Sequence, residues 1–248
     1  MTKARPIAVP AGKRGLAAAG TPARTREDAH SPRRTSPAAG TTPNAILEAA
    51  LKIFARDGFD GASMPAIAKA ASIGHPLIHY HFGSKVNLWR AAVDYAFGEL
   101  AASIAGAEQA AAGLEPIDAL QLLCRSFAQF TARHPLHIML LLNEVRVGGE
   151  RFDWLVERYL RPQHARVDRV IDAAVAAGQI KPIPAAHIAS IVVGATTHFF
   201  GAAPLVSRLY DVDVRDDSVV EAHTQWVIEV LLRGLAIDPA VPATERRR

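Results

Sequence analysis

The stretch Ser63–Phe82, SMPAIAKAASIGHPLIHYHF, decides the fold because it predicts two short helices joined by a tight turn. Ser63 is a favourable N-cap for the first helix, and Pro65 fits its first turn, where no backbone donor is needed. Gly74 and Pro76 mark the start of the second helix in the same way. Two helices with so short a connection form a helix-turn-helix.

The outward face of the second helix predicts what this unit touches. Four side chains share that face: His75, Leu77, His79 and Tyr80. In a DNA-binding helix-turn-helix the second helix lies in the major groove, where such side chains meet base edges and phosphates. A hairpin in an ordinary helical core would show the same pattern, so the stretch alone leaves both interpretations open.

The composition of the whole chain narrows the class of protein. Its 248 residues, half of them hydrophobic, are enough for one or two domains with a substantial core. A single cysteine, Cys124, excludes a disulfide framework and is typical of a reducing compartment. Neither a secretory signal nor an apolar run of membrane-spanning length is visible, so we expect a cytoplasmic protein without a membrane partner.

Positive charge is concentrated at the start of the chain. Residues 1–42 contain eight Lys or Arg against two acidic residues, a net charge of +6, so the other residues carry −2 of the chain's +4. The composition of residues 1–42 predicts a disordered basic arm, and residues 238–248 predict a flexible basic tail. The arm has two open interpretations, a contact to the minor groove or phosphates and a solubilising tail.

Helices are also predicted on both sides of the opening stretch. An apolar stripe predicts a helix from Pro43 to about Asp57, closed by Gly58. Ser84 is expected to cap a long helix that runs to about Ala110. His81 is expected to lie on the side toward the bundle, as a structural histidine.

Three motifs in this region resemble the N-terminal domain of the TetR/AcrR family of transcriptional regulators. They cover about fifty residues and occur in the order that the family shows. The residues that carry them are Phe54 with Gly58-Phe59, Ser63 with Ile67-Ala68, and Tyr80-His81-Phe82 with Ser84-Lys85 and Leu88. The resemblance implies an all-α fold with a helix-turn-helix domain at residues 43–98. A long helix would join it to a ligand-binding and dimerisation domain at residues 99–237.

The resemblance also implies which residues contact the DNA operator. Carried over position by position, they are Ser63, His75, Leu77, His79, Tyr80 and Lys85. This chain departs from the family pattern in the turn, where Ser72 stands in place of the usual glycine. His79 replaces a frequent Tyr and His75 a frequent Lys, which puts the operator sequence in doubt but not the fold.

Helical patterns continue through the second half of the chain, and no stretch alternates long enough for a strand. Leu136–Val147 is so apolar at first that a helix buried all round is expected. Pro162 is expected to kink or divide a long helix. The predicted helices cover Pro116–Arg133, Leu136–Val147, Arg151–Ala177, Ala185–Gly201 and Asp216–Leu235.

In proteins resembling this family the C-terminal helices enclose a small-molecule pocket, and the last two pair with a second subunit. A pocket for an apolar or amphipathic effector is predicted from Phe127, Phe130, His137, Ile138, Leu141 and Arg146. A homodimer interface is predicted from Val192, Phe199, Val220, His223, Val227 and Val230. Both sets also fit a simpler interpretation, in which the side chains face only their own core.

The sequence thus predicts a ligand-responsive repressor that binds a palindromic double-stranded DNA operator as a dimer. His134 and His137 lie three residues apart, but without a cysteine or acidic partner they do not predict a metal site. No cofactor is expected. An enzyme is the first alternative, although no nucleophile elbow, phosphate-binding loop or dinucleotide fingerprint occurs. A helical adaptor that binds another protein is the second.

Overall fold

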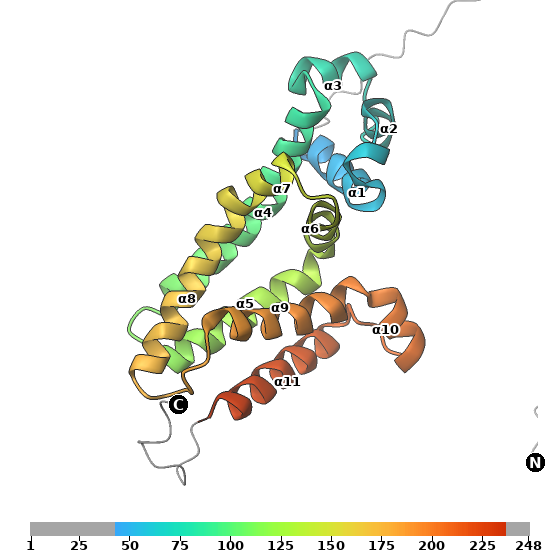
Figure 1. Cartoon of the computed structure of the whole chain (residues 1–248). Helices are drawn as coiled ribbons and strands as arrows, with labels where there is room; N and C mark the ends of the chain where they lie inside the picture. The colour runs from blue at the N-terminus through green and yellow to red at the C-terminus, as the bar shows by residue number, and fades with distance from the viewer. Residues whose placement is uncertain (1–42, 237–248) are drawn as a thin grey trace, which may run out of the picture. The chain divides into compact units, whose positions relative to one another are not determined.

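The computed structural model describes residues 43–236, and these form helices and connecting turns without a strand (Figure 1). This confirms the all-α class. The predicted basic arm, residues 1–42, and the predicted C-terminal tail, residues 238–248, lie outside the described residues. The helices are α1 (Pro43–Gly61), α2 (Met64–Ala70), α3 (His75–Phe82), α4 (Lys85–Ala110), α5 (Pro116–Arg133), α6 (Pro135–Val147), α7 (Glu150–Leu155), η1 (Val156–Leu160), α8 (Arg161–Ala176), α9 (Ala185–Gly201), α10 (Ala203–Tyr210) and α11 (Asp217–Leu235).

The first three helices close around one apolar cluster. Phe54 of α1, Ile67 of α2 and Ile78 of α3 are fully buried, and Trp89 from α4 completes the cluster. The regular part of α1 ends where the sequence predicts, because Gly58 takes a left-handed φ of 71° before one further turn. We call α1–α3 with the first turns of α4 the head.

Helix α4 runs without a break from the head to the far end of the other helices (Figure 1). It begins as predicted, since Ser84 Oγ accepts a hydrogen bond from the backbone N–H of Asn87 at 3.2 Å. Its inner face is buried from Leu88 to Ala107. The expected boundary between residues 98 and 99 falls inside this continuous helix, so the division into two domains stays a prediction.

Helix α6 differs from its prediction. The sequence favours a helix buried on all sides, but Leu142 and Val145 are more than half exposed and Met139 is exposed as well. One face of α6 packs on α1 and α9, which hide Ile138 and Leu140. The neighbours of α6 therefore cover only part of its circumference, and a run of apolar letters did not distinguish partial from complete burial.

The predicted long helix after Gly149 is divided as Pro162 suggests. A π-helical turn, η1, separates α7 from α8 and ends two residues before that proline. Proline cannot donate the backbone hydrogen bond of a regular α-helix, and a widened turn is one way to accommodate the loss. Ion pairs hold this segment beside α4, from Arg158 to Asp94 at 2.8 Å and from Arg166 to Glu108 at 2.9 Å.

The last three helices include one that the sequence did not predict. Helix α10 follows α9 after a sharp bend of 74° and ends at Asp211, whose φ is 53°. At eight residues it is too short to show a clear period. A second apolar cluster lies between α5, α8, α9 and α11, around Ile171 and Ile188. No single helix among the described residues is long and apolar enough to cross a membrane; only the bent pair α9 and α10 passes that test jointly.

Candidate nucleic-acid interface and ligand pocket

The turn between α2 and α3 is fixed by local hydrogen bonds. Ser63 caps α2 by accepting from the Ala66 N–H at 3.3 Å, as predicted for an N-cap. The N–H of Ile73 donates to the Ala68 carbonyl at 2.9 Å, which closes the turn. Ser72 takes a left-handed φ of 57°, a conformation that costs a residue with a Cβ on the order of 1–2 kcal/mol.

Helix α3 presents the four predicted side chains to solvent. Only Ile78 of this helix is buried, whereas His75, Leu77, His79 and Tyr80 are exposed, Tyr80 at 84%. The rings of His75 and His79 meet edge to face at 4.7 Å, and Nδ1 of His79 lies 3.2 Å from the Gly83 carbonyl. We call these four residues the reading face. His81 was expected to face the bundle, but it is exposed too, because the single buried position of α3 leaves no second inward side.

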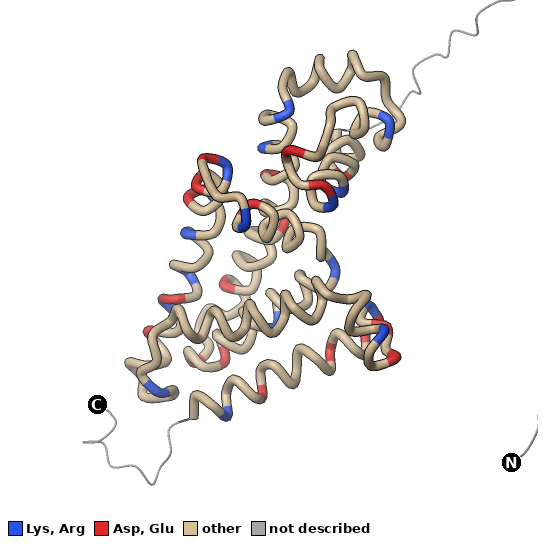
Figure 2. The backbone as a smooth tube through the Cα atoms, turned by 45° about the vertical axis from the view of Figure 1, so that its right-hand side comes forward, with Lys and Arg blue, Asp and Glu red and all other residues tan. Residues whose placement is uncertain are grey.

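The reading face carries no Lys, Arg, Asp or Glu. In Figure 2, α3 is therefore drawn without blue or red. The nearest cations in the sequence flank it, with Lys69 exposed near the end of α2 and Lys85 at the start of α4. Lys85 Nζ donates to the Asp60 carbonyl at 3.3 Å and lies 4.6 Å from the centre of the Phe59 ring. The ammonium group thus also ties the α1–α2 connection to α4.

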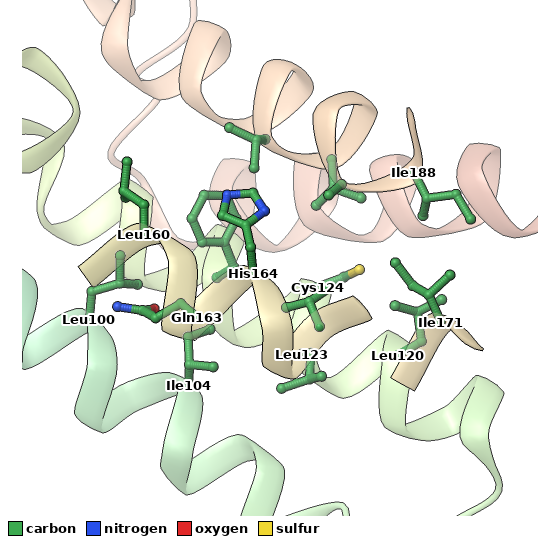
Figure 3. Close-up of a pocket in the computed structure, with 15 residues that line it drawn as sticks. Leu100, Ile104, Leu120, Leu123, Cys124, Leu160, Gln163, His164, Ile171 and Ile188 are labelled. Carbon is green, nitrogen blue, oxygen red and sulfur yellow. The ribbon is translucent and has the colours of Figure 1, made fainter. Parts of the chain in front are cut away.

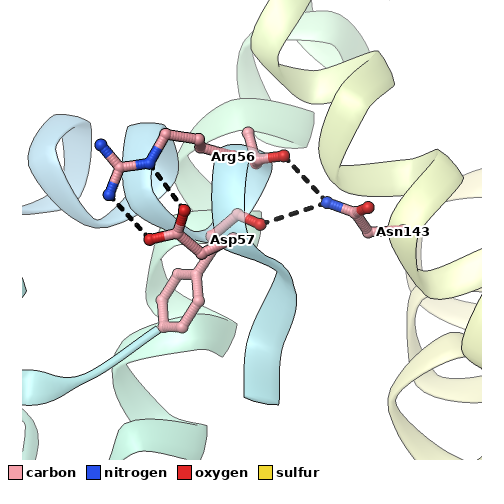
Figure 4. A network of polar contacts seen from close by, with 5 residues as sticks. Arg56, Asp57 and Asn143 are labelled. Carbon is pink, nitrogen blue, oxygen red and sulfur yellow. Dashed lines mark hydrogen bonds and ion pairs between the residues drawn. The ribbon is translucent and has the colours of Figure 1, made fainter. Parts of the chain in front are cut away.

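Polar side chains of α6 and α7 contact the head, and neither contact is visible in a sequence pattern. Asn143 of α6 donates from Nδ2 to the carbonyls of Phe54 at 3.3 Å and Ala55 at 2.9 Å (Figure 4). These carbonyls belong to the last regular turn of α1, where intrahelical donors run out. The partners of Asn143 lie 89 and 88 residues away in the sequence, so no local pattern indicates this contact.

The second contact is a buried ion pair beside the head. Arg151 Nε lies 3.1 Å from the buried Glu144 carboxylate, and the Arg151 guanidinium lies 4.0 Å from the centre of the Phe59 ring. Burial raises the pKa of Glu144, and the charge of Arg151 opposes that rise. Removal of either partner would leave the other charge without compensation.

A cavity of ≈ 100 Å³ lies between α4, α5, α8 and α9 (Figure 3). Its walls are almost entirely aliphatic or aromatic. Representative wall residues are Leu100 and Ile104 of α4, Leu123 and Phe127 of α5, Ile171 of α8 and Ile188 of α9. Among the described residues, the wall includes no Lys, Arg, Asp or Glu. An apolar pocket of this kind suits a small molecule without charge.

Most of the residues predicted to line a pocket lie elsewhere. Phe127 lines the cavity, but Phe130 and Ile138 are buried in the packing around α6, Leu141 is half-buried, and Arg146 is exposed. Helical spacing identifies an apolar stripe, but neighbouring residues of one stripe can face different partners. His137 borders a separate, charged hollow of ≈ 680 Å³ that is lined by Glu48, Glu99 and His134 among others.

Three polar groups face the apolar cavity: Cys124, Gln163 and His164. Burial raises the pKa of the Cys124 thiol to about 12, so it stays protonated at neutral pH and is a poor nucleophile. Gln163 and His164 lie in the first turn of α8 (Figure 3). Across residues 43–236, no group of three or more His, Cys, Asp or Glu side chains is placed to hold a metal ion.

Helices α9 and α11 expose an apolar face. Ile191, Trp226 and Val230 are each more than half exposed, and we call these three residues the apolar face. Behind them Phe199 and His223 stack at 3.8 Å, and Nε2 of His223 lies 3.2 Å from the Ala195 carbonyl.

Two of the six predicted interface residues need correction. Val192 is buried and lines the cavity, and Val220 is buried beside the charged hollow. A side chain already buried within one subunit has little surface left for a partner. Val230 is exposed, and Phe199, His223 and Val227 are half-buried. The interface formed by these four residues stays a prediction.

Both halves of the chain match known protein families. Residues 46–92 match the family described as "Bacterial regulatory proteins, tetR family". Residues 116–231 match the one described as "Tetracyclin repressor-like, C-terminal domain". The first match contains the helix-turn-helix, and the second contains most of the cavity wall.

Full-length relatives and a solved structure agree with these matches. The transcriptional repressor NicS of Pseudomonas putida is 25% identical over 207 residues, covering 79% of this chain and 93% of NicS. The transcriptional regulator RutR of Escherichia coli is 23% identical, covering 82% of this chain and 94% of RutR. The solved structure of KstR2 of Mycobacterium tuberculosis has a TM-score of 0.62 at 18% identity, covering 79% of this chain and 95% of that one. This last likeness shows the fold alone.

Proposed function

The chain belongs to the TetR family of bacterial regulatory proteins, and we propose that it is a repressor that binds a palindromic operator as a homodimer and leaves it when a small molecule binds. That it is a DNA-binding transcriptional regulator follows from the family and its regulator relatives. The observation that carries the proposal is the exposed reading face of α3, held by a capped turn and a buried core.

The reading face would meet the bases of the major groove. Tyr80 and Leu77 offer apolar surface for thymine methyl groups, and the imidazoles of His75 and His79 can donate or accept hydrogen bonds at base edges. Ser63 would contact a phosphate beside the first turn of α2. Lys85 would do so at the first turn of α4, where backbone donors also attract anions.

A dimer would place two copies of α3 on one operator. Palindromic half-sites lie about 34 Å apart, one turn of DNA, and a two-fold dimer matches that spacing. The apolar face of α9 and α11 supports this arrangement, because exposed Ile191, Trp226 and Val230 would gain burial against a second copy. The aromatic ring of Trp226, 62% exposed, is the largest of the three side chains.

The cavity supports an effector response. Leu100 and Ile104 line it from α4, and the same helix begins directly after α3. A molecule bound against those two side chains would favour a different position of α4 and so a different separation of the two reading faces. The extent of release depends on how much more tightly the ligand binds the dimer geometry that does not fit the operator than the geometry that does.

We further propose that the protein is not an enzyme and works in the cytoplasm, where its DNA partner would lie. The apolar cavity supports this, since burial holds its thiol, Cys124, in the neutral form and its wall includes no Asp or Glu among the described residues. The relatives described above are regulators as well.

Band-shift titration of the full chain on DNA selected from random fragments tests the proposal. Tyr80→Ala should weaken specific binding about fivefold or more, because one lost base contact is worth about 1–3 kcal/mol. Tyr210→Ala is the matched control, since Tyr210 is also highly exposed, at 71%, but lies on α10. Lys85→Ala is less informative because Lys85 also supports the α1–α2 connection.

Binding should weaken steeply with salt through the phosphate contacts. Equal binding by wild type and the Tyr80→Ala variant would contradict the reading face. For the dimer, Trp226→Glu should give a monomer in sedimentation velocity while Tyr210→Glu leaves the dimer intact. A Trp226→Glu variant that remains dimeric would exclude this apolar face as the interface.

A further inference from the structure

The polar side chains that line the cavity indicate the chemistry of its ligand more closely than the volume of the cavity does. Within a wall of aliphatic and aromatic side chains, Gln163 and His164 are the two groups with strong hydrogen-bonding capacity. His164 is exposed, whereas Gln163 is half-buried. In Figure 3 the Gln163 side chain extends toward α4, between Leu160, Leu100 and Ile104, and the His164 ring points toward α9.

Gln163 is not satisfied by the protein. Its Nε2 atom is buried and has no hydrogen-bond partner. Most buried polar atoms in native proteins have a partner, and an unpaired buried donor costs about 1–3 kcal/mol. The side chains beside Gln163 at the α4 end of the cavity are leucine and isoleucine, which have no hydrogen-bond acceptor. A molecule bound in the cavity, water or effector, can supply the missing acceptor.

We propose that the effector is a neutral, largely apolar molecule with one hydrogen-bond-accepting oxygen, such as a ketone or ester carbonyl, that binds the Gln163 amide at the α4 end of the cavity. This inference rests on the proposed function for its regulatory meaning, because the site is the one proposed to release DNA. The apolar body fills the space between α5, α8 and α9. The oxygen accepts from Gln163 of α8 beside Leu100 and Ile104 of α4, the helix that leads to the head.

The composition of the cavity wall also disfavours an effector that carries a charge. No Lys, Arg, Asp or Glu among the described residues lines the cavity, so an ionised ligand would lose part of its hydration without gaining a counter-ion from these side chains. A carboxylate or an ammonium ion would therefore bind more weakly than a neutral molecule of equal shape.

Four small aromatic probes of nearly equal shape test this class directly. Acetophenone carries the neutral acceptor, cumene has none, benzoate is the anion and benzamidinium the cation. Their dissociation constants for the full chain are measured by ligand-observed NMR, without DNA. The wild-type protein is compared with Gln163→Met, which keeps the length of the side chain and removes both donors. The matched control is Gln109→Met, at an exposed position near the end of α4.

The decisive quantity is the ratio of the acetophenone and cumene dissociation constants. Cumene is less well hydrated than acetophenone, so the ratio measured with one protein reflects both hydration and contacts in the cavity. Hydration of the probes is the same for every protein. A change of the ratio between wild type and variant therefore reports the contribution of Gln163. Gln163→Met should raise the acetophenone-to-cumene ratio about tenfold, and Gln109→Met should leave it unchanged. Gln163→Leu should repeat the result with a second side-chain shape. Both ions should bind more weakly than acetophenone to the wild type.

An unchanged ratio in both Gln163 variants would overturn the proposal, as would tighter binding of either ion. Absence of binding by both acetophenone and cumene would overturn it too. Operator release is measured separately in the band-shift titration. If acetophenone binds through Gln163 without altering operator affinity, the ligand class stands and the proposed effector response fails. If other molecules release the operator and the ratio does not respond to Gln163, the proposed function stands and this inference fails.

Discussion

The helix-turn-helix and the cavity differ in how widely their residues are spread along the chain. All of Ser63–Phe82 lies in one short stretch, with its caps, its turn and its buried Ile78 side by side. The cavity wall is assembled from α4, α5, α8 and α9, between Leu100 and Val193. One site is therefore specified by local chemistry, the other by long-range packing, and they should respond differently to the same substitution.

The largest expected difference comes from deleting an isoleucine in each region. Ile78 is fully buried in the head, and Ile104 is nearly as buried but has the cavity on one side. Ile78→Ala should lower the free energy of unfolding by about 4 kcal/mol, and Ile104→Ala by about 2 kcal/mol. A side chain that already borders empty space loses fewer contacts on truncation.

Urea unfolding at one fixed protein concentration measures both losses, because a dimer's stability depends on concentration. Each variant also needs the band shift, since Ile78→Ala should abolish DNA binding and Ile104→Ala should not. Equal losses of stability would mean that the cavity collapses around a truncated wall, and the contrast between the two regions would then be weaker than the structure indicates.

The same contrast explains how much could be predicted from sequence. Ser63, Gly58 and Ser84 act through backbone groups at most four residues away, so the helix ends that they mark were predicted closely. The four side chains of the reading face follow from one buried position, Ile78. Local chemistry was sufficient there because each partner lies within reach along the chain.

The pocket could not be predicted to the same degree. Phe127 and Phe130 share one stripe of α5, yet Phe127 lines the cavity while Phe130 stacks on the ring of His134 at 4.4 Å. Their difference depends on which helix lies opposite, and that is decided by contacts far apart in sequence. Gln163 gave no signal either, since an unpaired donor is visible only once its neighbours are placed.

The next largest effect concerns His137 of α6, at the junction of α4, α5 and α6. Its ring packs edge to face on Phe97 of α4 and Phe130 of α5, and Nδ1 bonds the His134 carbonyl. Burial lowers the pKa of His137 from 6.5 to about 4, and the bond to His134 opposes that shift. The unfolded chain therefore takes up a proton near pH 6.5 that the folded chain refuses until about pH 4.

The contribution of neutral His137 to the free energy of unfolding is fully present above pH 6.5. It should fall by about 3 kcal/mol as the pH drops toward 4. His137→Phe keeps a ring against the same neighbours and cannot titrate, so its unfolding free energy should depend less on pH over this range. His81→Phe, at an exposed position of α3, is the control and should retain the wild-type slope. If His137→Phe shows the wild-type slope instead, the junction is more open to water than its burial suggests.

A smaller effect should follow from cutting the contact between α6 and the head. Asn143→Ala removes two hydrogen bonds to α1 carbonyls and should cost about 1–2 kcal/mol in urea unfolding. Asn87→Ala is the control, because Asn87 is exposed and takes part in its cap only through its backbone N–H. Equal stability of the two variants would show that water replaces Asn143, and that the head is not held by this contact.

The smallest effect returns to the turn of the helix-turn-helix. Ser72 and Asp211 are the two non-glycine residues of 43–236 with a positive φ, 57° and 53°, one in the head and one at the end of α10. Ser72→Gly should stabilise the protein by about 0.5–1 kcal/mol, since glycine removes the steric cost but adds freedom to the unfolded chain.

Asp211→Gly should gain little, because aspartate tolerates the left-handed conformation better than most residues. Thermal unfolding of both variants at one protein concentration measures the difference. Operator affinity should stay unchanged in the Ser72→Gly variant, as glycine keeps the same backbone geometry and Ser72 lies outside the reading face. A Ser72→Gly variant that is more stable but binds DNA more weakly would show that the serine side chain itself contacts the operator, and that the turn contributes to recognition as well as to geometry.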